Sequence, residues 1–288
     1  MAEPTPLEPT QQGRVTVGPH GFHFERFGRG QRDTVCLLNG LAMHTRSWYP
    51  VLPRLLDQWD VLLYDYPGQG ESSWDDRPVE IPELAAALPA VLDAVAVERC
   101  HLLGISYGGF VALDAARLFH QRLHTLTLSG ILLSHEQLFQ MYEALSLRFY
   151  AGTEDEFELY TRYMYEKIFG ESFVRSVGPA LDAMRQRFFE RYRDRKRALV
   201  RLTEAQDPFF DRLDANLPGY RAVPTPTLIV AGAQDRVLPP WVQRKIAGVL
   251  PHVRYEELPD SGHVVYLEQP ERFFATIGAF FRRRDLDF

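Results

Sequence analysis

The chain has 288 residues, of which 45% are hydrophobic and 24% charged, and its formal net charge is −6. A net negative charge without clustered basic and aromatic residues argues against nucleic acid as a partner. No apolar stretch approaches the ~20 residues that a membrane-spanning helix needs. The composition therefore predicts a globular α/β core with room for one inserted element.

The segment 1–12 is polar and rich in proline, and it has neither the basic start nor the apolar centre of a signal peptide. We expect a disordered tail there. Cys36 and Cys100 both lie within apolar runs, a position typical of buried, reduced thiols. These observations predict a cytoplasmic protein.

Two alternating stretches, 14–18 and 22–28, flank a turn that begins at Pro19 and predict an antiparallel hairpin. The next strands have a different pattern. Residues 34–40 and 60–68 are continuously apolar and end in turn residues, which indicates strands buried on both faces.

Helical stretches alternate with these strands. One is expected around 47–58, and another over 81–97, where Pro89 should kink or divide the helix. A buried strand then ends at Ser106, and a helix is expected over 107–120.

A block of helical periodicity, 131–221, follows the next strand and contains many aromatic residues but no buried strand. The alternation of strands and helices then resumes at 224–235, 239–250, 253–259 and 270–284. Such alternation predicts a parallel sheet with helices on both faces. We therefore expect an α/β core formed by 13–130 and 222–288, with 131–221 as an all-helical cap over the carboxyl edge of the sheet.

The pattern Gly-x-Ser-x-Gly at residues 104–108 lies between a buried strand and a helix. It is typical of a nucleophile elbow, in which a sharp turn exposes the serine and the glycines remove side chains that would collide. The amides at the start of the helix also point toward Ser106 and can stabilise negative charge. Ser106 is therefore the candidate nucleophile.

A serine needs a base and an orienting carboxylate, which should follow it in the order acid, then histidine. Asp235 comes directly after the apolar run 228–234, and His263 lies in a turn after the last strand. Asp260 is the main competitor as the acid, although its turn position suits backbone capping better.

Other histidines are weaker candidates for the base. His101 begins its strand at the end far from Ser106, about 15 Å away at ~3.3 Å per residue, so it is excluded. His44 lies in a loop that approaches the site and remains a candidate substrate contact, with simple solvent exposure as the alternative.

Acyl transfer also requires donors for an oxyanion, supplied in such folds by the amide after the nucleophile and by one from the loop after the third strand. Here these are the backbone amides of Tyr107 and Leu41. The loop 39–42 has glycine at the strand tip, as that geometry requires.

These motifs, together with YDYPGQGES at 64–72, resemble the α/β-hydrolase superfamily over nearly the whole chain. The resemblance implies an eight-stranded, mostly parallel sheet with a helical cap after the sixth strand. Many members have histidine where this chain has Asn39, so the usual bonding of that histidine must be made otherwise. A serine at the elbow argues against the branches that use aspartate there.

The sequence therefore predicts a serine hydrolase, independent of cofactor and metal, that cleaves an ester or related acyl bond of a small hydrophobic acyl or aromatic substrate. The alternatives are an acyltransferase with a hydroxyacyl or acyl thioester donor, a carbon–carbon bond hydrolase of the same fold, and a noncatalytic binding module. The basic run 185–201 is most simply the solvated face of a helix, with attraction of an acyl carrier as the alternative. A homodimer is compatible with the sequence.

Overall fold

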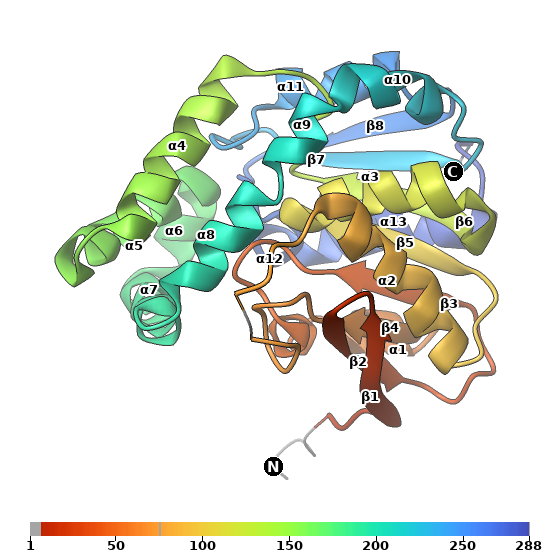
Figure 1. The fold of residues 1–288 in the computed structure, drawn as a ribbon. Coiled ribbons are helices and arrows are strands. Elements are labelled where there is room, and N and C mark those ends of the chain that lie inside the picture. Colours follow the sequence, from red (N-terminus) through yellow and green to blue (C-terminus); the bar gives the residue numbers. More distant parts are fainter. Residues whose placement is uncertain (1–6, 75, 288) are drawn as a thin grey trace, which may run out of the picture.

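The computed structural model describes residues 7–74 and 76–287 (Figure 1). Its strands form one sheet in the order β1-β2-β4-β3-β5-β6-β7-β8. Only β2 pairs antiparallel, with β1 on one side and β4 on the other, and every other pair is parallel. The strands are β1 (Gln11–Val17), β2 (His20–Phe27), β3 (Thr34–Leu38), β4 (Asp60–Tyr64), β5 (Cys100–Ile105), β6 (Leu123–Ser129), β7 (Thr227–Gly232) and β8 (Val253–Leu258). The predicted eight-stranded, mostly parallel sheet is confirmed.

The first strand begins earlier than the sequence suggested. Gln11 already pairs with Arg26, so the expected tail of residues 1–12 overlaps β1, and the Thr10 hydroxyl donates a 2.6 Å hydrogen bond to the carbonyl of Gly28. Residues 1–6 lie outside the described residues. This polar segment has no apolar pattern that would predict a strand, and it is a strand because its backbone pairs with β2.

Helices cover both faces of the sheet, and alternate residues of β3 divide between the two cores. Cys36 and Leu38 pack with α2 (Ile81–Ala94) and α3 (Tyr107–Phe119), whereas Val35 and Leu37 pack with the residues of α1 (Pro53–Leu56) and α13 (Pro270–Arg283). Burial on both faces explains why these strands are apolar at every position. Both cysteines are buried, free thiols.

Three predicted helices differ in detail from the structure. The stretch 47–58 contains only a 3₁₀ turn, Thr45–Trp48, and the short α1. The stretch 239–250 is divided into α11 (Pro240–Gln243) and a 3₁₀ segment. By contrast, α2 is not divided and continues through Pro89, because its buried apolar face outweighs one lost backbone hydrogen bond.

All helices between β6 and β7 belong to one insert, which Figure 1 shows beside and above one edge of the sheet. Its aromatic side chains form a cluster of their own around Phe157 and Tyr160, so many of them serve internal packing. None of the helices in the described ranges has the length and apolar character to cross a membrane. The insert consists of α4 (Gln137–Ala151), α5 (Glu154–Ile168), α6 (Glu171–Val177), α7 (Ala180–Tyr192), α8 (Lys196–Glu204), α9 (Asp207–Asp211) and α10 (Leu213–Arg221).

Candidate active site

Ser106 lies at the turn between β5 and α3, with a φ of 49° and a ψ of −123°. A positive φ is strained for any residue with a side chain, so the surrounding structure must hold it. Its amide donates a 2.8 Å hydrogen bond to the carbonyl of Ser129 at the end of β6, and its carbonyl accepts a 2.7 Å bond from Gly109. These contacts fix the serine at the carboxyl edge of the sheet.

The two glycines of the motif are required by close backbone approach. A Cβ on Gly104 would lie 2.4 Å from the carbonyl oxygen of Gly108, and one on Gly108 would lie 2.6 Å from that of Leu38. Real Cβ atoms do not approach oxygen so closely. The absence of side chains thus lets β5 and α3 meet at a sharp angle.

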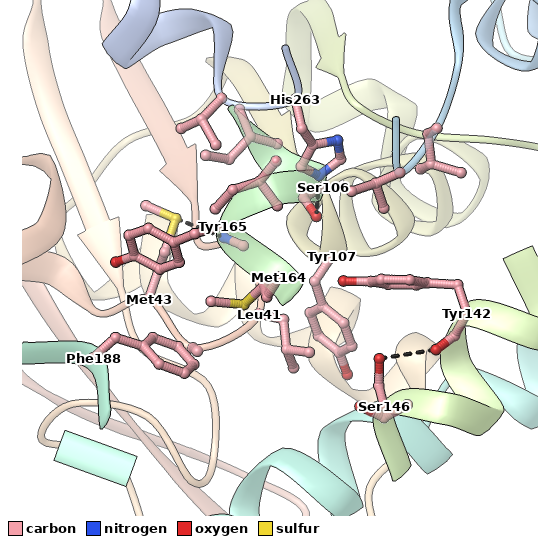
Figure 2. A pocket seen from close by; sticks show the side chains of 18 of the residues that line it. Leu41, Met43, Ser106, Tyr107, Tyr142, Ser146, Met164, Tyr165, Phe188 and His263 are labelled. Atoms are coloured by element: carbon pink, nitrogen blue, oxygen red, sulfur yellow. Dashed lines mark hydrogen bonds between the residues drawn. The ribbon is translucent and has the colours of Figure 1, made fainter. Parts of the chain in front are cut away.

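The structure brings the three side chains that the sequence singled out into one hydrogen-bonded row. His263 Nε2 lies 2.9 Å from Ser106 Oγ, and His263 Nδ1 lies 2.8 Å from Asp235 Oδ2 (Figure 2 shows the Ser106 and His263 end). Burial alone would lower the pKa of His263, but the charge of Asp235, the hydrogen bond to it and the charge of Glu268 together raise that pKa above its ordinary value. The imidazole is therefore a stronger base than an isolated histidine.

Asp235 is held in place by four hydrogen bonds. Its Oδ1 accepts from the amides of Val237 and Leu238, at 2.9 and 2.8 Å, and its Oδ2 accepts from Gln243 as well as facing His263. These contacts fix the orientation of the carboxylate toward His263.

The competing residues lie elsewhere. Asp260 is an exposed turn residue with a φ of 57°, and the carboxylate that contacts His263 Nδ1 is that of Asp235. His101 is fully buried against Thr125, as its place at the start of β5 required. His44 does not line the cavity beside Ser106; its imidazole contacts Arg191 of α7 instead. The expectation of a substrate contact at His44 is therefore not supported, because the insert covers this side chain.

The backbone amides of Leu41 and Tyr107 flank Ser106, and neither donates a hydrogen bond to any described residue. A Cβ on Gly40 would lie only 3.6 Å from the Cβ of Ser106, so this loop approaches the serine closely. That these two amides are the oxyanion donors stays a prediction.

Asn39 lies at the centre of a buried hydrogen-bond network. Its amide donates to the Tyr64 carbonyl and to Asp65 Oδ1, at 3.1 and 3.0 Å, while its oxygen accepts a 2.9 Å bond from the indole of Trp48. Gln69 donates a further bond to the Gly40 carbonyl. The loop that presents Leu41 is thus fixed by a buried polar network.

Two residues that sequence reasoning missed support this row. The Gln243 side chain donates to Asp235 and to the Leu238 carbonyl, and its oxygen accepts a 3.0 Å bond from the Gly130 amide. Gly130 has a φ of 63°, and a Cβ there would lie 2.6 Å from His263 Cε1. The glycine directly after β6 was a signal for a close approach, whereas nothing in the sequence marks Gln243.

A cavity of about 320 Å³ opens beside Ser106, between the edge of the sheet and the insert. Aromatic and aliphatic side chains form most of its wall (Figure 2). Pockets of this size and character bind small, largely apolar molecules. Among the described residues, no group of three or more His, Cys, Asp or Glu side chains could hold a metal ion.

The sheet, the sharp serine turn and the row of hydrogen-bonded side chains define an α/β protein with a nucleophile elbow. A family model described as the alpha/beta hydrolase fold matches residues 33–270, and the chain belongs to this family.

Two curated relatives resemble the chain over almost its full length. RutD of Pseudomonas syringae pv. syringae (strain B728a), whose name is that of a carbamate hydrolase, is 28% identical over 271 residues, covering 90% of this chain and 98% of the relative. Pyrrolizixenacetamide deacetylase of Xenorhabdus hominickii is 24% identical over 275 residues, covering 95% and 99%.

A solved structure has the same fold. It is MGS-M2, an alpha/beta hydrolase enzyme from a deep-sea metagenome library of the Medee basin, with a TM-score of 0.85 at 21% identity. The match covers 96% of this chain and 99% of that one.

Proposed function

We propose that the protein is a serine hydrolase that cleaves an ester or related acyl bond of a small hydrophobic substrate. The observation that carries this proposal is the continuous row from Asp235 through His263 to Ser106, with contacts of 2.8 and 2.9 Å, at the wall of an apolar cavity. The names of two relatives, a carbamate hydrolase and an acetamide deacetylase, also describe hydrolysis at a carbonyl group.

In this mechanism Ser106 Oγ attacks the substrate carbonyl carbon while His263 Nε2 takes the hydroxyl proton. Asp235 accepts a hydrogen bond from His263 Nδ1, which keeps Nε2 free to accept a proton and stabilises the imidazolium that forms. The amides of Leu41 and Tyr107 stabilise the oxygen anion of the tetrahedral intermediate.

His263 then gives the proton to the leaving group as the bond to the carbonyl carbon breaks, which leaves an acyl group on Ser106. A water molecule attacks this acyl-enzyme, with His263 again taking the proton. Collapse of the second intermediate returns the proton to Ser106 Oγ and releases the acid.

The test is labelling with a fluorophosphonate probe, combined with turnover of p-nitrophenyl esters of increasing acyl length. We expect the native protein to label and to hydrolyse an ester, and Ser106→Ala to lose both activities. Ser47→Ala is the matched control, because Ser47 also lines the cavity but belongs to the 3₁₀ turn after His44. Absence of labelling in the native protein would contradict the proposal.

Product analysis in the presence of a competing alcohol separates hydrolysis from acyl transfer. Free acid as the main product supports the hydrolase, whereas a new ester as the main product identifies an acyltransferase. Turnover that persists in Ser106→Ala would exclude this serine as the nucleophile.

A further inference from the structure

The cavity has two chemically different ends. Figure 2 shows Ser106 and His263 at one end, while the side chain of Tyr107 extends from there toward Ser146 of α4. Apolar side chains such as Leu41 and Met164 lie between them. A substrate whose carbonyl lies at Ser106 therefore extends its remote end toward α4.

Three buried polar atoms of the cavity wall have no hydrogen-bond partner among the described residues, and Glu143 is close enough to Tyr107 to act on its hydroxyl electrostatically. They are the Tyr107 hydroxyl, the Thr203 hydroxyl and Glu143 Oε1, and all three residues line the cavity. Tyr107 is 2% exposed and Thr203 4%. Leaving buried polar groups unpaired is unfavourable, so a polar partner at this place would be stabilising.

These groups come from three different elements. Tyr107 begins α3 of the core, Glu143 belongs to α4 and Thr203 to α8. Ser146 lies three residues after Glu143, on the same face of α4, and also lines the cavity. Core and insert thus both contribute polar groups to the cavity wall.

The charge of this end selects among polar partners. Burial, and to a smaller extent the nearby Asp207 carboxylate, raise the pKa of Glu143 to about 8. A substrate group that donates a hydrogen bond satisfies the Glu143 carboxyl in either protonation state, and a positively charged group also stabilises its ionised form. Above about pH 8, where Glu143 is ionised, a substrate carboxylate would instead meet repulsion from it, so substrate groups are best compared at such a pH.

We propose that Glu143, Thr203 and the Tyr107 hydroxyl, here called the polar subsite, bind a hydroxyl or amino group at the end of the acyl chain remote from the bond that is cleaved. This inference rests on the proposed function, because Ser106 fixes the other end of the substrate. The substrate class is thus an acyl compound with an apolar middle and a terminal hydrogen-bond donor.

The test compares four p-nitrophenyl esters of equal chain length, derived from hexanoate and ending in methyl, hydroxyl, dimethylammonium or carboxylate. We expect kcat/KM for the hydroxyl ester to exceed that for the methyl ester by about tenfold, the gain of one well-placed hydrogen bond. The carboxylate ester should be the poorest. Equal values for the methyl and hydroxyl esters would overturn the proposal, since water alone would then satisfy the polar subsite.

Substitutions in the polar subsite test which residues cause the preference for the hydroxyl ester. Glu143→Leu should abolish the preference for the hydroxyl ester while the methyl ester is still hydrolysed. Glu143→Gln should keep the preference for the hydroxyl ester but lose the stabilisation that an ionised Glu143 gives to the dimethylammonium ester. Thr203→Val, which preserves side-chain shape, should weaken the preference in the same direction. The control is Glu190→Leu on the exposed face of α7, which should leave all four rates unchanged. An equal loss for all esters in Glu143→Leu would indicate a structural role and contradict the proposal.

Failure of the proposed function would give a different result, namely no Ser106-dependent turnover of any of the four esters. Calorimetric binding of hexanamide and 6-hydroxyhexanamide to Ser106→Ala then tests the polar subsite without catalysis. Tighter binding of the hydroxyamide supports the inference, and equal affinities overturn it.

Discussion

The edge of the sheet around Ser106 and the helical insert that faces it are stabilised in different ways. At the edge, directional hydrogen bonds hold the row from Asp235 to Ser106, as the four contacts of Asp235 show. In the insert, ring contacts predominate, such as those of Phe157 with Tyr160 and Phe189, and Glu143 Oε1 remains unpaired. Directional bonds fix atoms to within a fraction of an ångström, whereas apolar packing tolerates exchange of side chains. Under the proposed function, bond cleavage takes place at the edge, and the insert contributes to the choice of substrate.

The largest expected effect is that of Asp235→Asn, which tests whether the hydrogen-bonded edge carries the chemistry. Asparagine preserves the shape but can reverse the tautomer of His263, and kcat should fall by about 10⁴-fold. Asp260→Asn, in the exposed turn nearby, should leave kcat almost unchanged. Similar losses in both variants would contradict the assignment of Asp235 as the acid.

The pH dependence of kcat/KM in the native protein and in Asp235→Asn gives a second test. His263 must be neutral to act as a base, and its pKa is raised above 6.5, so kcat/KM of the native protein should fall already as the pH drops through a value above 6.5. Removing the negative charge of Asp235 lowers the pKa of His263. The acid limb should therefore move to lower pH in Asp235→Asn, and a shift in the opposite direction would refute the cause given for the raised pKa.

A change in packing at the same edge should cost several kcal/mol of stability. In Gly104→Ala the new methyl group would lie 2.4 Å from the Gly108 carbonyl oxygen, and we expect a loss of about 3 kcal/mol in the free energy of unfolding by urea. Gly248→Ala is the control, because a Cβ there meets nothing within 4 Å, and its effect should stay within about 1 kcal/mol. Equal stabilities would show that the elbow can relax.

Gln243→Leu should have an intermediate effect. It removes one donor to Asp235 and leaves the Gly130 amide without its acceptor, at a cost of about 2 kcal/mol in stability. Because the leucine does not touch the serine, kcat should fall far less than in Asp235→Asn, by about tenfold. Gln186→Leu, at an exposed position of α7, serves as the control for both measurements.

The last prediction concerns the insert. The pKa of Glu143 is raised in the folded chain, so its contribution to stability is lost as the pH rises from 4.5 toward about 8. Glu143→Gln does not titrate, so its stability relative to the native protein should increase over this range, by at most about 1.4 kcal/mol per pH unit. Unfolding at pH 5 and pH 9 measures this difference, and a pH-independent difference would show that the carboxyl is not desolvated.

The sequence predicted the fold and the candidate site for a reason that is visible in the topology. Ser106 follows β5, Asp235 follows β7 and His263 follows β8, and parallel strands end at one edge of a sheet. The pattern of apolar strands that end in turn residues was therefore enough to predict that these distant side chains meet.

Features that depend on three-dimensional packing were not predictable in this way. Gln243 meets Asp235 only because α11 packs beside β7, and an amide in a short helix carries no pattern. The contact of His44 with Arg191 of α7 and the persistence of α2 through Pro89 likewise follow from contacts between elements rather than from local residue preference.

The junction between α5 and α6 is fastened to the loop that carries His263. The His263 amide donates a 2.7 Å hydrogen bond to the Ile168 carbonyl, the Glu268 carboxylate accepts from the amides of both Gly170 and Gly262, and Arg236 donates to the Phe169 carbonyl. An outward movement of this junction would drag the imidazole away from Ser106. The alignment of His263 with Ser106 is therefore coupled to the position of this part of the insert.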